Sequence, residues 1–266
     1  PCYVSYQACT ILAGGIPVAV PAKIENEFRI TPSELEEHLS PRTKAILIGY
    51  PNNPTGAIMN RENLLAIADF AKQLDLIVIS DEIYGDLTYD GEHTCFASLP
   101  DMKERTILLN GFSKAYAMTG WRIGYALGNA DIIAAMTKIH QYTMLCAPIT
   151  AQTAAIEALR RGEKYMKKMV AEYDRRRHLI YDGFTKMGLP CFEPKGAFYI
   201  FPNISPTGYT SEEFAEKLLQ AEHVALVPGS AFGKCGEGHV RCSYATSIDK
   251  ISEALARIEN FVKKRK

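Results

Sequence analysis

Three short apolar segments in the first half of the chain predict buried strands. They are rich in Ile, Leu and Val, and turn-forming or polar residues follow each at once; they span 44–49, 76–79 and 106–109. Between the first two, residues 61–74 carry apolar side chains at the spacing of an amphipathic helix. Strands alternating with a helix in this order predict βαβ units and a parallel sheet.

The rest of the chain predicts one more strand, then a series of helices, and then a second set of short strands and helices. A strand at 121–127 precedes helices at 130–142, 150–160 and 163–187. Beyond these, strands are predicted at 196–201, 225–227 and 239–243, and helices at 211–221 and 247–264. We therefore predict an α/β protein with a mostly parallel sheet and flanking helices in residues 1–164, and a smaller C-terminal α/β domain in residues 165–266.

Polar side chains follow all three strands of the predicted parallel sheet. Asn53 lies in the turn after the first strand, Asp81 and Tyr84 follow the second, and Ser113 and Lys114 follow the third. Ligands of open α/β sheets bind outside the carboxyl ends of the strands. One polar strand end is ordinary, but three on neighbouring strands predict an active site at this edge.

Lys114 carries the most specific chemistry among these residues. It directly follows a strand, and Arg122 lies eight residues further on. A lone lysine in such a place is more often a solvated loop residue than a functional one. Together with the other polar strand ends, however, the pair indicates a Schiff-base lysine and a phosphate-binding arginine.

Composition and charge exclude several classes of function. Of 266 residues, 47% are hydrophobic, and Lys plus Arg balance Asp plus Glu at 30 each. A neutral chain of this kind argues against nucleic acid or a membrane surface as partner, and no apolar run is long enough to span a bilayer. The seven cysteines are scattered without C-x-x-C spacing, which predicts no metal site or disulfide framework and favours a cytoplasmic setting. The basic residues 263–266 are interpreted as a solvated helix end.

Four motifs in order along the chain carry a resemblance to a known family. They are Asn53-Pro54-Thr55-Gly56, Ser80-Asp81-Glu82-Ile83-Tyr84, Ser113-Lys114 through Gly120-Trp121-Arg122-Ile123-Gly124-Tyr125, and Arg241-Cys242-Ser243-Tyr244-Ala245. Together they resemble the motif set of class I and II pyridoxal-phosphate-dependent aminotransferases, and most closely the branch of the aspartate, aromatic and N-acetyl-diaminopimelate enzymes. The resemblance covers essentially the whole chain. It implies the fold type I architecture of pyridoxal-phosphate transferases and the transfer of an α-amino group from an amino acid to a 2-oxo acid.

The resemblance also implies a role for each residue around the cofactor ring. Lys114 matches the lysine that forms the Schiff base with pyridoxal 5′-phosphate and then acts as general base and acid. Asp81 matches the carboxylate that keeps the pyridine nitrogen protonated. Tyr84 and Asn53 match residues that hydrogen-bond to the cofactor 3′-oxygen. Without the resemblance, these three would be taken for a turn aspartate, a core tyrosine and a turn asparagine.

Four further residues match contacts to the phosphate, the substrate and the ring face. Arg122 matches the arginine that binds the cofactor phosphate with its planar fork, and the Ser113 hydroxyl adds a second contact. Many family members also carry a small hydroxyl residue three positions before the lysine, where this chain has Gly111. Arg241 matches the arginine that binds the substrate α-carboxylate, rather than a surface ion-pair partner. Tyr3 aligns with the aromatic residue that stacks on the cofactor ring, although an aromatic residue there is otherwise usually core.

Family members carry a further N-terminal segment ahead of the position of Pro1. That segment contributes to the phosphate site and reaches the neighbouring subunit, so the resemblance implies a homodimer when the protein is full length. The chain from Pro1 to Lys266 is accordingly expected to be a fragment that binds the cofactor weakly and has negligible activity by itself.

Two alternatives to an aminotransferase stay open at this point. The first is a carbon–sulfur β-lyase with the same fold and cofactor. The second is the aminotransferase-like sensor domain of a transcription regulator. The residues do not identify the amino donor or the oxo-acid acceptor.

Overall fold

The computed structural model describes residues 1–264, which form two compact units. Unit 1 contains residues Pro1–Ile30 and Asn52–Ile58 together with the chain from Ala171 onward. Unit 2 contains Thr31–Pro51 and Met59–Val170. The sequence-based division at residue 164 stays a prediction.

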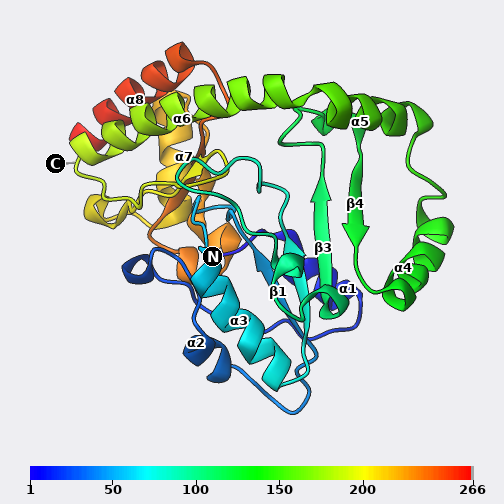
Figure 1. Cartoon of the computed structure of the whole chain (residues 1–266). Helices are drawn as coiled ribbons and strands as arrows, with labels where there is room; N and C mark the ends of the chain where they lie inside the picture. Colours follow the sequence, from blue (N-terminus) through cyan, green and yellow to red (C-terminus); the bar gives the residue numbers. More distant parts are fainter. Residues whose placement is uncertain (265–266) are drawn as a thin grey trace. The chain divides into compact units, whose positions relative to one another are not determined.

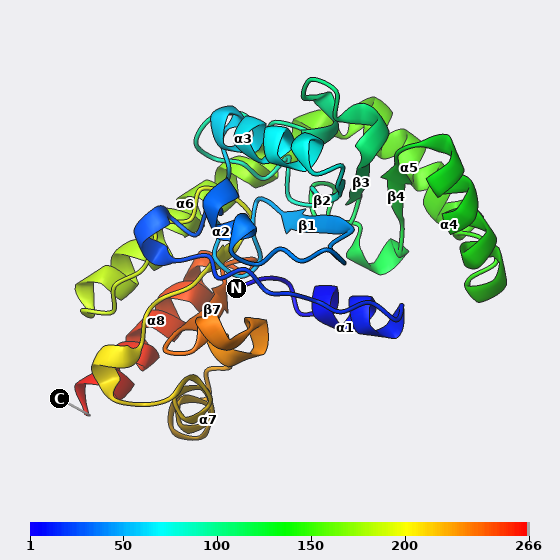
Figure 2. The same cartoon turned by 90° about the horizontal axis from the view of Figure 1, so that it is seen from below.

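The core of unit 2 is a four-stranded sheet in the order β1-β2-β3-β4 (Figures 1 and 2). Strands β1 (Ala45–Gly49), β2 (Ile77–Asp81) and β3 (Thr106–Gly111) are parallel, and β4 (Gly124–Leu127) runs antiparallel to β3. The apolar, β-branched segments of the sequence thus form a mostly parallel sheet, as predicted. The parallel pairing brings the carboxyl ends of β1, β2 and β3 to one edge.

Helices connect and flank this sheet. The described helices that start in unit 2 are α2 (Pro32–Glu36), α3 (Arg61–Gln73), α4 (Ala130–Thr143), α5 (Ile149–Arg161) and α6 (Glu163–Lys186), the last of which ends in unit 1. Helix α2 begins with a capping box between Thr31 and Glu34, and the Asn60 side chain caps α3. Helix α3 buries its apolar face, which includes Leu64 and Ile67. This helix is the crossover that the β1-α3-β2 pattern requires.

Unit 1 contains a small antiparallel sheet in the order β5-β7-β6. Its strands are β5 (Tyr199–Ile200), β6 (Val227–Pro228) and β7 (Val240–Ser243), and its helices besides α6 are α1 (Ser5–Leu12), α7 (Ser211–Glu222) and α8 (Ile248–Lys263). Short 3₁₀ turns complete the described parts of both units: η1 (Ile24–Asn26), η2 (Phe96–Ser98), η3 (Lys103–Arg105), η4 (Thr119–Trp121), η5 (Ser205–Thr207), η6 (Gly229–Phe232) and η7 (Lys234–Gly236).

Three predicted strands are shorter in the structure. The strand predicted at 225–227 is confined to Val227–Pro228. The strand predicted at 121–127 begins only at Gly124, because Thr119–Trp121 forms a 3₁₀ turn and Arg122 adopts a left-handed backbone conformation with φ of 55°. The strand predicted at 196–201 is confined to Tyr199–Ile200, because Ala197 is also left-handed, with φ of 57°. A single left-handed residue turns the chain out of the extended conformation.

Two further sequence interpretations concern the chain ends and membranes. The basic segment 263–266 was interpreted as a helix end, and its last two residues lie outside the described part of the chain. None of the helices formed by residues 1–264 combines the length and apolar character that crossing a membrane requires.

Candidate active site

The predicted site residues fall into two groups, one in each unit. The lysine group in unit 2 comprises Asp81, Tyr84, Ser113, Lys114 and Arg122. Tyr3, Asn53 and Arg241 belong to unit 1. Of these three, Asn53 and Arg241 are in direct contact and are called the arginine group below.

The loop that carries Lys114 is a compact turn held by its own backbone. The carbonyl of Phe112 accepts hydrogen bonds from the backbone N–H groups of Tyr116 and Met118, and the Lys114 carbonyl accepts from that of Ala117. Phe112 and Met118 are buried against Ala155 of α5. The turn therefore has a hydrophobic anchor on each side of the lysine, which limits the positions its side chain can reach.

The Lys114 amine lies beside an aromatic ring from the neighbouring strand end. Its Nζ is 5.5 Å from the centre of the Tyr84 ring, which follows β2 and is 5% exposed. This distance is in the range of a cation–π contact. The strand ends of β2 and β3 thus bring together the lysine and the tyrosine that the sequence predicts to be neighbours.

Arg122 is linked back to the lysine turn through Thr119. The Thr119 hydroxyl donates to the Ser113 carbonyl at 2.9 Å, and the Thr119 carbonyl accepts from Nη1 of Arg122 at 2.9 Å. Both Ala117 and Arg122 have positive φ without being glycine, which costs about 1 kcal/mol or more at each. The Thr119 hydrogen bonds help to offset this cost and tie the arginine to the lysine turn.

Asp81 is the last residue of β2 and is placed by the sheet. Its backbone pairs with Gly49 of β1 and Leu109 of β3, and its Oδ1 accepts a hydrogen bond from the N–H of Ile83 at 3.1 Å. The side chain is only partly buried. It therefore presents a carboxylate at the same sheet edge as Lys114.

Glu82, next to Asp81, is a buried carboxylate that sequence reasoning did not single out. It is 3% exposed, and its Oε1 accepts from the Ser80 hydroxyl at 2.9 Å and from the N–H of Phe96 at 2.8 Å. Nε2 of His93 lies 2.7 Å from its other oxygen. These contacts hold the chain on both sides of Asp81 and Tyr84. The available signal was a second acidic residue directly after a buried strand.

Gly111, which stands where the family resemblance led us to expect a hydroxyl residue, has a packing explanation. It pairs with Gly124 across the β3–β4 ladder, and a Cβ at Gly111 would lie 2.9 Å from the Gly124 Cα and 3.1 Å from the Ile123 carbonyl oxygen. A side chain does not fit without a shift of β4. The departure from the family pattern is therefore matched by the close approach of these two strands.

In unit 1, Arg241 of β7 is held by one polar and two aromatic contacts. Its Nη1 donates to Oδ1 of Asn53 at 2.9 Å, and its guanidinium carbon is 4.5 Å from the Tyr199 ring centre and 4.9 Å from that of Phe232. Its Nε is buried and has no hydrogen-bond partner among the described residues. An unsatisfied N–H on a guanidinium fixed in this way suits a carboxylate ligand.

Asn53 is positioned by a buried turn that explains the Asn-Pro-Thr-Gly motif. The Asn52 side-chain oxygen accepts from the N–H and the hydroxyl of Thr55, and the Asn52 carbonyl accepts from the N–H of Gly56. Gly56 has φ of 72°, and a Cβ there would lie 2.5 Å from Cβ of Pro194. Only glycine meets both demands, so the turn is fixed by its sequence.

Tyr3 lies in the segment that leads into α1. It is 40% exposed and packs edge-on against Tyr6, with ring centres 5.6 Å apart. Its ring is thus available for a contact on one face rather than enclosed in a core. No described contact joins it to the residues of the arginine group.

The donor set of the lysine group fits pyridoxal phosphate. Each side chain is chemically suited to one group of that molecule: the amine to the aldehyde and the carboxylate to the ring nitrogen. The phenol is suited to the 3′-oxygen, and the guanidinium to the phosphate. No three His, Cys, Asp or Glu residues within 1–264 gather as metal ligands. The fold and the site together therefore define a pyridoxal-phosphate type of α/β enzyme.

Comparison with known proteins identifies the family. The family model "Aminotransferase class I and II" matches residues 1–258. The chain is 52% identical to the putative aminotransferase YugH of Bacillus subtilis over 99% of its own length and 68% of that protein. It is 51% identical to an aspartate aminotransferase of Pyrococcus abyssi over 100% of its own length and 69% of that protein. The crystal structure of an aromatic aminotransferase from Pyrococcus horikoshii superposes with a TM-score of 0.98 at 50% identity, covering 100% of this chain and 72% of that one.

The chain belongs to the class I and II aminotransferases and is a pyridoxal-phosphate-dependent enzyme that transfers an amino group from an amino acid to a 2-oxo acid. The predicted family, fold class, cofactor and reaction are thereby confirmed. All three relatives cited are named as aminotransferases, so nothing among them favours the β-lyase or the transcription regulator.

Proposed function

We propose that the lysine group holds the cofactor and carries out the proton transfers. Lys114 would hold the cofactor through its amine and, once released, would move the proton at the substrate α-carbon. Asp81 keeps the ring nitrogen protonated by pairing with it. Pyridoxal phosphate, when bound, supplies an electron sink for the bonds at the α-carbon. The observation that carries this assignment is the placement of Lys114 beside Tyr84 at adjoining strand ends.

The other residues of the lysine group, and two residues of unit 1, bind and orient the cofactor. Arg122 contacts the phosphate with its planar fork, and the Ser113 hydroxyl adds a hydrogen bond. The Tyr84 hydroxyl contacts the 3′-oxygen. The family motifs assign two residues of unit 1 to the cofactor as well, Asn53 to the 3′-oxygen and Tyr3 to the ring face. These roles rest on the family motifs together with the positions described above.

We further propose that Arg241 binds the substrate α-carboxylate and that Asn53 holds the guanidinium in place. The support is the unsatisfied buried Nε of Arg241 and its 2.9 Å hydrogen bond to Asn53. The two aromatic rings beside the guanidinium exclude water from it, which strengthens its attraction for a carboxylate. Arg241 is thus the residue that selects amino acids and 2-oxo acids over amines and aldehydes.

The assembly and the donor substrate are also proposals. A homodimer is the form in which we expect the full-length protein to act, by analogy with the family. A cytoplasmic setting is supported by the cysteines, all seven of which are free thiols. Relatives named for aspartate and for aromatic amino acids define the first donors to test.

One set of assays tests these assignments together. Full-length protein is screened with aspartate and aromatic amino acids as donors and 2-oxoglutarate as acceptor. Asp81→Asn should lower kcat by more than about a hundredfold while the cofactor stays bound, since it removes the charge that stabilises the reacting ring. Arg241→Lys should raise the KM of donor and acceptor with a smaller effect on cofactor binding. Asp81→Asn within about tenfold of the wild type would refute the role of Asp81.

A further inference from the structure

Three consecutive arginines on α6 have different surroundings. Arg175 and Arg176 each pair with Glu172 at 3.0 Å, and their side chains are 71% and 19% exposed. The Arg176 guanidinium also lies 5.6 Å from the centre of the Tyr173 ring. Arg177 turns inward, and its side chain is 2% exposed. Burying an arginine destabilises the folded protein unless its N–H donors have hydrogen-bond partners, so the partners of Arg177 indicate its structural role.

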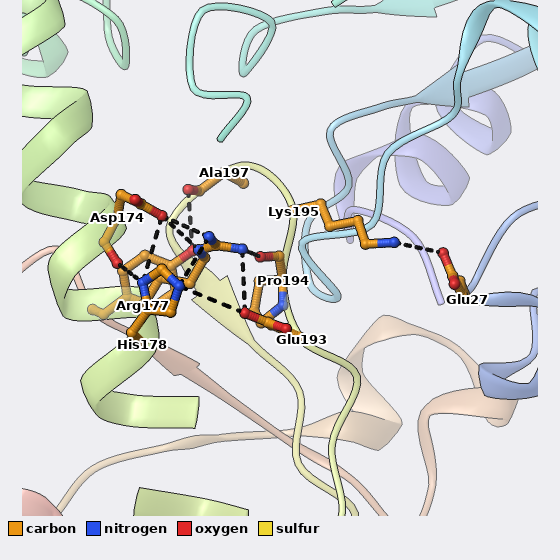
Figure 3. A network of polar contacts seen from close by, with 9 residues as sticks. Glu27, Asp174, Arg177, His178, Glu193, Pro194, Lys195 and Ala197 are labelled. Carbon is orange, nitrogen blue, oxygen red and sulfur yellow. Dashed lines mark hydrogen bonds and ion pairs between the residues drawn. The ribbon is translucent and has the colours of Figure 1, made fainter. Parts of the chain in front are cut away.

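The Arg177 guanidinium joins α6 to the segment 193–197 that follows it (Figure 3). On the helix, its Nε and Nη2 contact Oδ1 of Asp174 at 2.8 and 2.7 Å. Toward the segment, its Nη1 donates to the Pro194 carbonyl at 2.8 Å and lies 3.5 Å from a carboxylate oxygen of Glu193. One planar cation thus holds two acidic side chains and a backbone carbonyl.

The segment held by Arg177 supports the turn that carries Asn53. The backbone N–H groups of Lys195 and Gly196 both donate to the Gly56 carbonyl at 2.9 Å. Gly56 packs so closely on Pro194 that no Cβ fits between them. The position of the Asn52–Gly56 turn is therefore set by the position of residues 194–196.

The same segment also places the aromatic support of Arg241. Ala197, labelled in Figure 3, takes a left-handed conformation. Its carbonyl accepts from the Tyr244 hydroxyl at 3.3 Å. Two residues later, Tyr199 pairs with Ser243 of β7 and lies under the Arg241 guanidinium at 4.5 Å. Lys195 extends outward and pairs with Glu27 at 3.0 Å.

We propose that Arg177 is a positioning residue for the substrate-carboxylate site, a proposal that rests on the assignment of Arg241 to the α-carboxylate. It holds the Pro194 carbonyl, through which the turn of Asn53 and the ring of Tyr199 are fixed on the two sides of Arg241. Arg177 itself touches neither substrate nor cofactor. Its loss removes the hydrogen bond to the carbonyl of the buried Pro194, so the segment relaxes and Arg241 loses its fixed orientation.

The test compares Arg177→Lys with Arg175→Lys in the full-length protein loaded with pyridoxal phosphate. The two changes are chemically identical and lie on the same turn of the helix, but Arg175 is 71% exposed and pairs with Glu172 at the surface. The readouts are the dissociation constants of succinate and 3-phenylpropionate by calorimetry, the dissociation constant of the cofactor, and the thermal midpoint. These two unreactive acids report the carboxylate site separately from catalysis.

Arg177→Lys should weaken both acids by about tenfold or more, the scale of one lost charged hydrogen bond. Arg175→Lys should stay within about twofold, as expected for an exposed pair. The cofactor dissociation constant should change less than those of the two acids in Arg177→Lys, because Asn53 is the one proposed cofactor contact whose turn rests on the segment that Arg177 holds. If Arg177→Lys does not fold, Asp174→Asn, which removes the carboxylate that orients Arg177, should give the same pattern.

A double-mutant cycle separates this proposal from the one on which it rests. Arg241→Lys alone should weaken both acids, and if it does not, the assignment of Arg241 is wrong. In the Arg241→Lys background, Arg177→Lys should add less than about twofold, because the two act through one contact. Arg177→Lys within about twofold of the wild type, an equal effect in both backgrounds, or failure of both Arg177→Lys and Asp174→Asn to fold would overturn the positioning role.

Discussion

Replacement of Gly56 by alanine tests the packing of the motif turn in unit 1. Its φ of 72° lies in the left-handed region, and an added Cβ would lie 2.5 Å from Cβ of Pro194 and 2.9 Å from the carbonyl oxygen of Tyr199. The left-handed backbone costs about 1 to 2 kcal/mol for a residue with a side chain. The overlap of the added Cβ with its neighbours costs about 1 to 3 kcal/mol. Gly56→Ala should therefore lower the free energy of unfolding by about 2 to 5 kcal/mol.

Gly208 in the same unit provides a matched control. It has φ of 74°, but nothing lies within 4 Å of the position its Cβ would take. Gly208→Ala should cost only the backbone term of about 1 to 2 kcal/mol, and the effect of alanine on the unfolded chain is the same at both sites. Urea unfolding followed by circular dichroism measures the two differences. Equal destabilisation by Gly56→Ala and Gly208→Ala would refute the claim that Pro194 and Tyr199 enclose Gly56.

Three further predictions follow from other contacts. Thr119→Val removes the hydroxyl that donates to the Ser113 carbonyl and should weaken cofactor binding about threefold to tenfold, whereas Thr119→Ser should bind the cofactor as the wild type does. Equal cofactor affinities of Thr119→Val and the wild type would contradict the link between Lys114 and Arg122. Burial raises the pKa of Cys191 to about 12, so at pH 8 only about one part in ten thousand is thiolate, and a disulfide reagent should label the exposed Cys9 and Cys146 much faster, as peptide mapping would show. Burial lowers the pKa of His239, so the neutral form favours folding, and this stabilisation is lost as the pH falls below the ordinary histidine pKa of about 6.5. His239→Gln should therefore flatten the pH dependence of the free energy of unfolding between about pH 7 and 5, and an unchanged slope would show that another group titrates.

Much of the fold could be predicted from the sequence because its elements follow simple patterns. Apolar β-branched runs predicted β1, β2 and β3, and helical spacing with polar flanks predicted α3. Helix α1 was not predicted, because Ser5–Leu12 buries none of its residues and so lacks an amphipathic signal. The predicted first residues of β4 and β5 were wrong, because Arg122 and Ala197 take left-handed conformations. Such a conformation is usually expected only of glycine or asparagine, and neither residue occupies these two positions.

The site divides in the same way between local pattern and long-range packing. Lys114, Asp81 and Arg241 stand in ordered motifs, so the residues could be named from the sequence. The supports of these residues could not. Arg177 follows two other arginines, and nothing in the sequence shows which of the three is buried. The hydrogen bond from Arg241 to Asn53 joins residues 188 positions apart, a contact that only the folded chain defines.

The attachment point of the cofactor tests the account's central claim most directly. The full-length protein loaded with pyridoxal phosphate is reduced with borohydride, digested, and mapped by mass spectrometry for the peptide that carries the cofactor. The account predicts a single modified peptide with the adduct on Lys114, and loss of that adduct in Lys114→Ala. An adduct on any other lysine, or an unchanged yield in Lys114→Ala, would contradict it.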